Sequence, residues 1–217
     1  MRSTLIALAL LAGFTLTIAV AQKPDPATAA NQLRGNRFPA LKWDTMTPEQ
    51  KRMVEHILAG DRSTLGGPFN VLLRSPEMGD LAAQMGGVMR FHSSIPKKLN
   101  EMAIILTARH WTSEYEWYAH RRAAAEAGLA EAKIKAIAAN RKPEGLDADE
   151  QLVYTFCTEM LRTHQLSDAT FNATKAKFGE RGIVDLIGVM GWYQMVSMSL
   201  NADRYPLPEG AKPELNN

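Results

Sequence analysis

The sequence has a single cysteine, Cys157, among 217 residues. One cysteine cannot form an intramolecular disulfide, and it cannot complete a two-cysteine redox cycle within one chain. The charges are nearly balanced, with 25 Lys and Arg against 23 Asp and Glu and no dense basic run. Such a balance lacks the electrostatic footprint of a protein that binds a phosphate backbone. Nucleic acid is therefore not an expected partner.

Several motifs of common enzymes are also missing. The chain has no Gly-x-Ser-x-Gly elbow, no glycine-rich phosphate loop and no His-Glu-x-x-His or Glu-x-x-His element. The motif patterns of serine hydrolases, nucleotide enzymes and the usual helical zinc and di-iron sites are thus absent. A metal held by Glu101, Glu116 and His120 stays geometrically open. We nevertheless predict no metal and no cofactor.

Strand signals are scarce, whereas helix signals recur along the chain. No alternating strand pattern or Asn-Gly hairpin is found, and 30 Ala, 23 Leu and 11 Met outnumber 8 Val and 10 Ile. Capping boxes begin at Thr47 and Asp147. The capping and proline signals predict helices at 48–60, 76–92, 96–111, 113–128 and 147–164, one from 167 or 168, and one after Gly182. Short loops favour antiparallel neighbours, so the predicted fold is an all-α antiparallel helical bundle.

Residues 1–21 have the composition of a secretory signal peptide. Arg2 is followed by an apolar run from Leu5 to Val20, and the segment ends in Ala19-Val20-Ala21, which suits cleavage after Ala21. The alternative is an uncleaved transmembrane anchor, which prefers about 20 apolar residues. We predict cleavage and export to the periplasm or beyond, with no membrane contact after cleavage.

The rest of the chain is predicted to form one domain. Residues 22–44 contain three prolines among polar and small residues, a composition typical of a linker or a surface arm. After the last predicted helix, Pro206, Pro208 and Pro213 prevent further helix. We therefore assign residues 45–208 to the folded domain and residues 209–217 to a C-terminal tail.

The first candidate functional residue is Glu101, in the segment KKLNEMAIILTARHW. Apolar residues occupy nearly every direction around this helix, which predicts that it is buried. At about 100° per residue, Glu101 falls between Ile105 and Ala108, so its carboxyl group should lie beside apolar surface. Such a carboxyl is either paired or has a raised pKa. The alternative is that Glu101 stays hydrated in the first turn, where the helix dipole favours it.

The following helix places Ser113, Glu116 and His120 on one face, at i, i+3 and i+7. A Glu four residues before a His can hold one imidazole nitrogen and leave the other for chemistry. The alternative, which spacing alone favours, is a Ser113–Glu116 capping box and a surface pair of Glu116 with His120. Capping or surface roles are expected for the remaining histidines, His56, His92, His110 and His164.

These residues give the chain a resemblance to the carboxymuconolactone decarboxylase and alkylhydroperoxidase D-like family, over residues 38–208. The most specific part is 96–128: a Glu in NEMAIILTAR, then YEW and AH before an alanine-rich turn ending in Gly. In the peroxidase branch the Glu is followed after 12 and 15 residues by cysteines and after 19 by a His. Those positions are Glu101, Ser113, Glu116 and His120 here, so the chain is most similar to the decarboxylase-like branch.

The resemblance implies a fold, an assembly and a reaction class. It implies homo-oligomers, often trimers or hexamers, with the Glu/His site near a subunit boundary. It further implies cofactor-free general acid/base chemistry on a small organic acid or lactone, with His120 as the general acid, poised by Glu116 or Glu101. We expect Arg109 to bind the substrate carboxylate, with Arg121 or Arg122 as substitutes, and Ser113 to contact the substrate. The alternative for Arg109 is a helix-end residue that faces water.

Two alternative functions remain from the sequence. Peroxide reduction needs an attacking and a resolving thiol, and we predict that Cys157 is a buried, inert thiol instead. The other alternative is a non-catalytic exported oligomer that binds a hydrophobic ligand between its subunits. Gly188, Gly191 and the methionines of the last helix suit such an assembly, although they equally suit a core helix.

Overall fold

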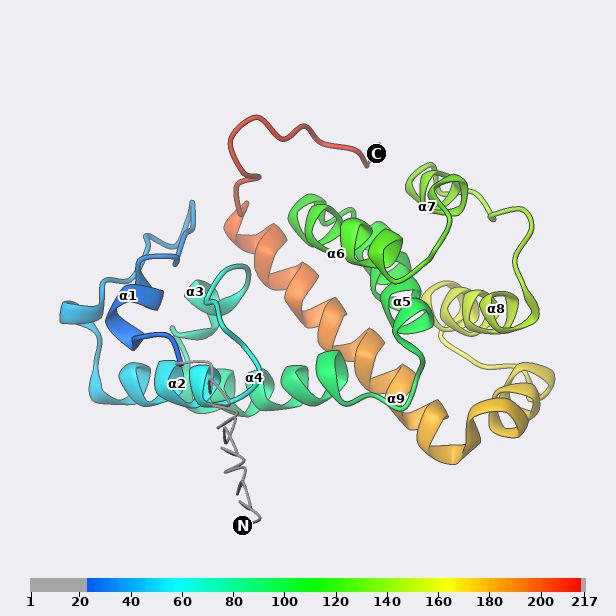
Figure 1. Cartoon of the computed structure of the whole chain (residues 1–217), viewed down its shortest axis with the longest axis horizontal. Helices are drawn as coiled ribbons and strands as arrows, with labels where there is room; N and C mark the ends of the chain where they lie inside the picture. The colour runs from blue at the N-terminus through cyan, green and yellow to red at the C-terminus, as the bar shows by residue number, and fades with distance from the viewer. Residues whose placement is uncertain (1–22, 216–217) are drawn as a thin grey trace, which may run out of the picture.

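The computed structural model describes residues 23–215, and helices are its only regular elements (Figure 1). The prediction of an all-α fold is confirmed. The predicted signal peptide, residues 1–21, lies outside the described residues. A single 3-10 turn spans Trp43–Thr45, and the α-helices are α1 (Pro26–Ala30), α2 (Pro48–Ala59), α3 (Phe69–Leu72), α4 (Pro76–Phe91), α5 (Lys97–His110), α6 (Glu114–Glu126), α7 (Glu131–Ala138), α8 (Ala148–Thr163) and α9 (Asp168–Asp203).

Helix starts follow the capping signals in the sequence. Thr47 and Gln50 form the reciprocal capping box that opens α2, and Asp147 and Glu150 form the one that opens α8. Each box satisfies two backbone N–H groups that the helix itself leaves without a partner. The side chain of Ser167 accepts a hydrogen bond from the backbone of Thr170 and opens α9. The predicted caps at these three starts are confirmed.

The C-terminal part of the chain differs from the two helices predicted there. One helix runs from Asp168 to Asp203, and its single non-helical residue is Gly179, at φ 70° and ψ 179°. Gly182, where the sequence suggested a break, lies inside the helix and is buried. A Cβ atom on Gly182 would lie 2.3 Å from the Cβ of Phe178, so this glycine permits close packing. The kink therefore occurs three residues earlier than predicted.

The predicted linker or arm before α2 is packed against the rest of the protein. It contains α1, whose Ala30 is buried together with the following Leu33. The backbone N–H groups of Asn36 and Phe38 donate to one carboxylate oxygen of Asp203, at 3.1 and 2.8 Å, and so attach this segment to the end of α9. Three further helices, α1, α3 and α7, are too short to have been predicted, with 5, 4 and 8 residues.

Helix α5 is the centre of the core. Every residue from Leu99 to Ala108 is buried, as the all-round apolar pattern predicts. Figure 1 shows α9 crossing the middle of the molecule beside α5, and α5 packs against α6, α8 and α9. Glu101 belongs to this buried stretch and is only 4% exposed. An ionised carboxylate at such a depth requires a partner, because burial removes its hydration.

Helix α9 has the length and apolarity of a membrane-crossing helix, with a mean hydropathy of 1.3 over 18 residues. Length and composition alone do not distinguish such a segment from a core helix. In this structure 56% of that window is buried against the rest of the chain. Packing against α4, α5 and α8 accounts for much of its apolar character.

Candidate active site

Glu101 and His120 face one another across the α5–α6 hairpin. A short connection that includes Thr112, at φ 44°, joins the two helices, and α6 runs back along α5. The side chains are 6% and 3% exposed, and Oε2 of Glu101 lies 2.7 Å from Nδ1 of His120. The Glu/His pair that the family resemblance implies is thus brought together within one chain. Glu101 is not a hydrated first-turn residue, because His120 is its buried partner.

A second carboxylate, Glu116, contacts the other nitrogen of the same imidazole. Its Oε1 lies 3.1 Å from Nε2 of His120, and Glu116 is also buried. Burial alone would lower the pKa of His120, but the charge of Glu116 and hydrogen bonds to Glu101 and Glu116 outweigh it and raise the pKa to about 9. His120 is therefore an imidazolium at neutral pH, with each ring N–H donating to a carboxylate.

The two carboxylates differ in their access to a ligand. Glu116 and His120 line a cavity of about 190 Å³, whereas Glu101 does not. The cavity therefore borders the Glu116 side of this cluster, where the contact to Nε2 of His120 is longer than the contact of Glu101 to Nδ1. Glu101 holds the far nitrogen from within the core. The sequence suggested that Glu116 holds one imidazole nitrogen and leaves the other free, but in this structure Glu101 contacts the second nitrogen.

The capping-box alternative for Ser113 and Glu116 is not observed. Ser113 precedes α6 but makes no side-chain cap, and Glu116 is directed to His120 instead. Ser113 is fully buried, and its hydroxyl has no hydrogen-bond partner within residues 23–215. It is not among the residues that line the cavity beside His120, so the structure does not place it as a substrate contact.

The cavity is formed by four parts of the chain that are distant in sequence. They are the loop before α3 with the start of α3, the end of α4, the first half of α6 and the middle of α9. Helix α6 supplies Tyr115, Ala119 and the two charged residues, and the other segments supply Arg62, Thr64, Gly66, Gly67, Pro68, Phe69, Arg90, Trp192, Tyr193 and Val196. Charged, aromatic and apolar groups thus share one space of small-molecule size.

Arg62 and Arg90 give this cavity two positive charges near His120. Within residues 23–215 neither arginine forms an ion pair with a carboxylate, and Nε of Arg62 is buried without a hydrogen-bond partner. Burial and the charge of Arg90 lower the pKa of Arg62. The Arg62 guanidinium lies over the rings of Phe69 and Phe91, at 5.0 and 5.7 Å, which holds it in place. Arg90 is exposed, and the guanidinium groups of both arginines border the cavity, which suits a bound anion.

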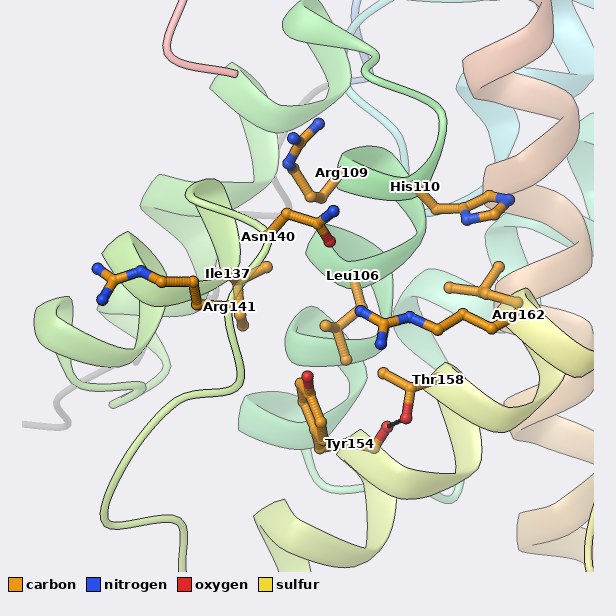
Figure 2. A pocket seen from close by; sticks show the side chains of 10 residues that line it. Leu106, Arg109, His110, Ile137, Asn140, Arg141, Tyr154, Thr158 and Arg162 are labelled. Carbon is orange, nitrogen blue, oxygen red and sulfur yellow. Dashed lines mark hydrogen bonds between the residues drawn. The ribbon is translucent and has the colours of Figure 1, made fainter. Parts of the chain in front are cut away.

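Arg109 lies elsewhere, at the last turn of α5 (Figure 2). It follows Glu101 by eight residues, which is about 12 Å along the helix. Its Nη1 donates to Thr112, and it lines a separate cavity of about 40 Å³ between α5, α7 and α8. The substitutes Arg121 and Arg122 pair with surface carboxylates. Arg109 therefore does not line the cavity beside His120, whereas Arg62 and Arg90 do.

The basic groups in Figure 2 have a structural explanation. Arg109 and His110 end α5, Arg162 ends α8, and Arg141 follows α7, so all four lie at helix C-termini. Positive side chains there offset the negative end of each helix dipole. Figure 2 also shows Arg141 extending away from the space that it borders. This second cavity gives no comparable case for chemistry.

Two of the remaining histidines form exposed ion pairs. His56 lies 2.8 Å from Asp80 and His92 lies 2.7 Å from Asp61, with both imidazoles more than half exposed. His164 caps the C-terminus of α8 in the left-handed conformation, at φ 60°. The surface and capping roles expected for these three residues are confirmed.

The placement of the two carboxylates does not suit a metal. Glu101 and Glu116 contact opposite nitrogens of one imidazole, so the three side chains do not converge on a common point. Among the described residues no group of three or more His, Cys, Asp or Glu is placed to hold a metal ion. The chemistry available to this site is proton transfer and the binding of an anion.

Cys157 lies on α8 and is completely buried. Burial raises the pKa of its thiol to about 12, so the reactive thiolate does not form near neutral pH. We expect iodoacetamide to label Cys157 only after unfolding, as measured by mass spectrometry, and thiol-dependent peroxide reduction to be negligible. Dithiol-driven peroxide turnover that disappears in Cys157→Ser would contradict this.

The arginines of the site could not be found from a motif. Arg62 and Arg90 are separated from His120 by 58 and 30 positions, and only tertiary packing brings the three together. The carboxylates and the imidazole, in contrast, lie on a local hairpin.

In the comparisons with known proteins, no family model, no curated protein and no solved structure matches this chain.

Proposed function

We propose that this protein is a cofactor-free enzyme that uses general acid/base chemistry on a small organic acid or lactone. Decarboxylation, or a related lyase reaction, is the reaction class that we favour. The observation that carries the proposal is the buried imidazole of His120, which lies between two carboxylates and lines a cavity that also contains Arg62 and Arg90. The resemblance of residues 96–128 to the lactone decarboxylases supports the same class.

The proposed reaction assigns a separate task to each side of the cavity. Arg62 and Arg90 bind a carboxylate of the substrate through paired N–H donors. When a carbon–carbon bond breaks and CO₂ leaves, the bonding electrons remain on the substrate as an enolate or carbanion. His120 then donates the proton of Nε2 to the substrate, and solvent returns a proton to the imidazole. Glu101 holds Nδ1 throughout and fixes the orientation of the ring.

A protonated His120 is suited to donate a proton to the substrate rather than to accept one. Because the carboxylates raise the pKa of His120 to about 9, the imidazolium form prevails across the neutral range. A substrate oxygen or carbon must displace Glu116 from Nε2 to receive the proton. Glu116 is therefore proposed to act at the site by tuning His120, in agreement with its place on the cavity wall.

The direct test is turnover of a panel of small carboxylic acids and lactones by the mature protein. Release of CO₂, or exchange of substrate protons with D₂O, would be followed by nuclear magnetic resonance. His120→Gln serves as the inactive control. Turnover that survives in His120→Gln would contradict the proposed site, and a panel with no turnover at all would contradict the lyase assignment.

Assembly into a homo-oligomer, as a trimer or a hexamer, is part of the proposal, as is export by the N-terminal segment. A row of large apolar side chains on α4 is exposed at a spacing of three and four residues: Met78, Leu81, Met85, Val88 and Phe91. Val184 and Ile187 of the adjoining α9 are exposed as well. An apolar surface of this kind on a single chain is characteristic of a protein interface.

Leu81, which at 70% is the most exposed residue of this row, provides the test of assembly. We expect the wild-type protein to sediment and scatter light as an oligomer, and Leu81→Glu to shift it towards a monomer by placing a charge in the interface. Phe171→Glu is the matched control, because Phe171 is an exposed apolar residue that lies before the α9 kink. Wild-type protein that scatters as a monomer would contradict the assembly.

A further inference from the structure

Tyr193 is the residue of the cavity whose environment the proposed function leaves unexplained. It lies on α9, is 2% exposed and lines the same cavity as Arg62 and Arg90. Its ring meets the imidazole of His120 edge to face, with 4.9 Å between the centroids and 75° between the planes. Tyr193 therefore forms one wall around the proposed proton donor.

The hydroxyl of Tyr193 is buried and has no hydrogen-bond partner among residues 23–215. The charges of Glu116, Arg90, Glu101 and Arg62 all act on it, so the hydroxyl lies within the charged cluster. A buried hydroxyl without a partner destabilises a fold, and phenylalanine at the same place would avoid that cost. The arrangement is accounted for if a ligand in the cavity supplies the missing acceptor.

The Tyr205 hydroxyl, in contrast to that of Tyr193, has a hydrogen-bond partner within the protein. The Tyr205 hydroxyl accepts a hydrogen bond of 3.2 Å from the backbone N–H of Gly67, beside the same cavity. Its hydrogen-bonding capacity is thus used by the protein itself. Tyr193 and Tyr205 therefore differ, and the hydroxyl of Tyr193 has no protein partner in the described part of the chain.

The protonation state of Tyr193 determines whether its hydroxyl acts as a hydrogen-bond donor or as a base. Burial raises the pKa of Tyr193 far above its ordinary value, and the negative charge of Glu116 raises it further. The phenol consequently stays protonated at any pH at which the protein works. It is available to donate a hydrogen bond and is unsuited to accept a substrate proton.

Packing fixes Tyr193 relative to the arginine on α4. The neighbouring Trp192 lies directly against Gly86, where a Cβ atom would be only 2.3 Å from the indole ring. This close contact joins α9 to α4 at a point one turn before Arg90. Arg90 and Tyr193 are therefore held on two helices whose contact has little freedom to slide.

We propose that the Tyr193 hydroxyl is a fourth ligand-contacting donor of this site, after the two arginines and His120, and that it hydrogen-bonds an oxygen of the carbonyl or carboxyl group that stays on the substrate when CO₂ leaves. The inference rests on the proposed function and adds the group that stabilises the negative oxygen. When the carbon–carbon bond breaks, its electrons move onto that oxygen as an enolate. Tyr193 keeps its proton and stabilises the charge by hydrogen bonding, while His120 supplies the proton that is transferred.

The test uses malonate as the probe and the mature full-length protein. Isothermal titration calorimetry would measure malonate affinity for wild type, for Tyr193→Phe and for an Arg62→Ala/Arg90→Ala double variant. We expect Tyr193→Phe to bind malonate about ten-fold more weakly, as the loss of one hydrogen bond to a charged group predicts. The double arginine variant should show no measurable binding. Tyr154→Phe, in the separate cavity of Figure 2, is the matched control and should bind like wild type.

Thermal stability supplies a second readout that needs no ligand. If the hydroxyl has no protein partner, ligand-free Tyr193→Phe should melt about 2–4 °C higher than wild type. A clearly lower melting temperature would show a structural role and overturn the inference. Unchanged malonate affinity in Tyr193→Phe, with binding lost in the arginine variant, would also overturn it and leave the proposed function standing. Failure of wild type to bind malonate would count against both.

Discussion

Replacing either Glu101 or His120 by glutamine should remove most of the turnover of any acid that the wild-type protein converts. We expect losses of about 100-fold to 10,000-fold, the range of a positioned general acid. The double replacement should cost little more than the worse single one, because Glu101 acts only by holding and charging His120 at 2.7 Å. Steady-state kinetics of the three variants would measure this. Fully additive losses, or unchanged rates, would mean that the pair is structural.

Two further variants make this result specific to the site. Glu116→Gln removes the charge that contributes most to raising the pKa of His120, so activity should fall less and the basic limb of its pH profile should move to lower pH. Glu126→Gln is the matched control on the same helix, since Glu126 only pairs with Arg122 at the surface. Its kinetics should equal those of wild type. Circular dichroism would establish that every variant retains its helices.

The contact between Glu101 and His120 could be predicted because it is local. Each residue lies roughly two to three turns from the connection between α5 and α6, and the helical period alone gives its direction. The apolar residues around Glu101 predict its burial, and burial leaves few partners other than a residue of the adjoining helix. The contact between Glu101 and His120 can therefore be inferred largely from residues that are close in the sequence.

The other residues of the site meet through contacts between segments that are distant in the sequence, and no sequence pattern predicts these contacts. Arg109 was expected at the substrate because it shares a helix with Glu101, but helical rise places it far from His120. Arg62 precedes α3 and Tyr193 lies on α9, and their approach to His120 follows from how α9 packs against α3, α5 and α6. No spacing rule relates such distant segments. Glu116 was ambiguous for another reason, since it lies three residues after a possible cap partner, Ser113, and four residues before His120.

The kink in α9 illustrates the same limit within a single helix. Gly179 and Gly182 are both glycines in a polar-to-apolar transition, and either could end a helix. The structure uses Gly179 for a backbone angle that glycine favours and Gly182 for contact with Phe178. Only the packing of the helix against its neighbours separates these two uses.

The buried cluster of His120 also determines how the stability of the protein changes with pH. In the unfolded chain the imidazole has its ordinary pKa of 6.5, whereas the folded protein raises the pKa to about 9. A group with a raised folded-state pKa stabilises the fold fully below the unfolded value. That contribution is lost as the pH rises through the folded value. At about 1.4 kcal/mol per pKa unit, the difference corresponds to about 3 kcal/mol.

We therefore expect the free energy of unfolding to fall by about 3 kcal/mol between pH 6.5 and pH 9, as the imidazolium between Glu101 and Glu116 loses its proton. Urea unfolding at fixed protein concentration, repeated across this range, would measure the fall. His120→Gln should be less stable than wild type at pH 6 and should lack this slope, because its side chain does not titrate. His92→Gln removes an exposed imidazole paired with Asp61 and should keep the slope of wild type. A slope that persists in His120→Gln would assign the titration to another group and contradict the charged state on which the proton donor depends.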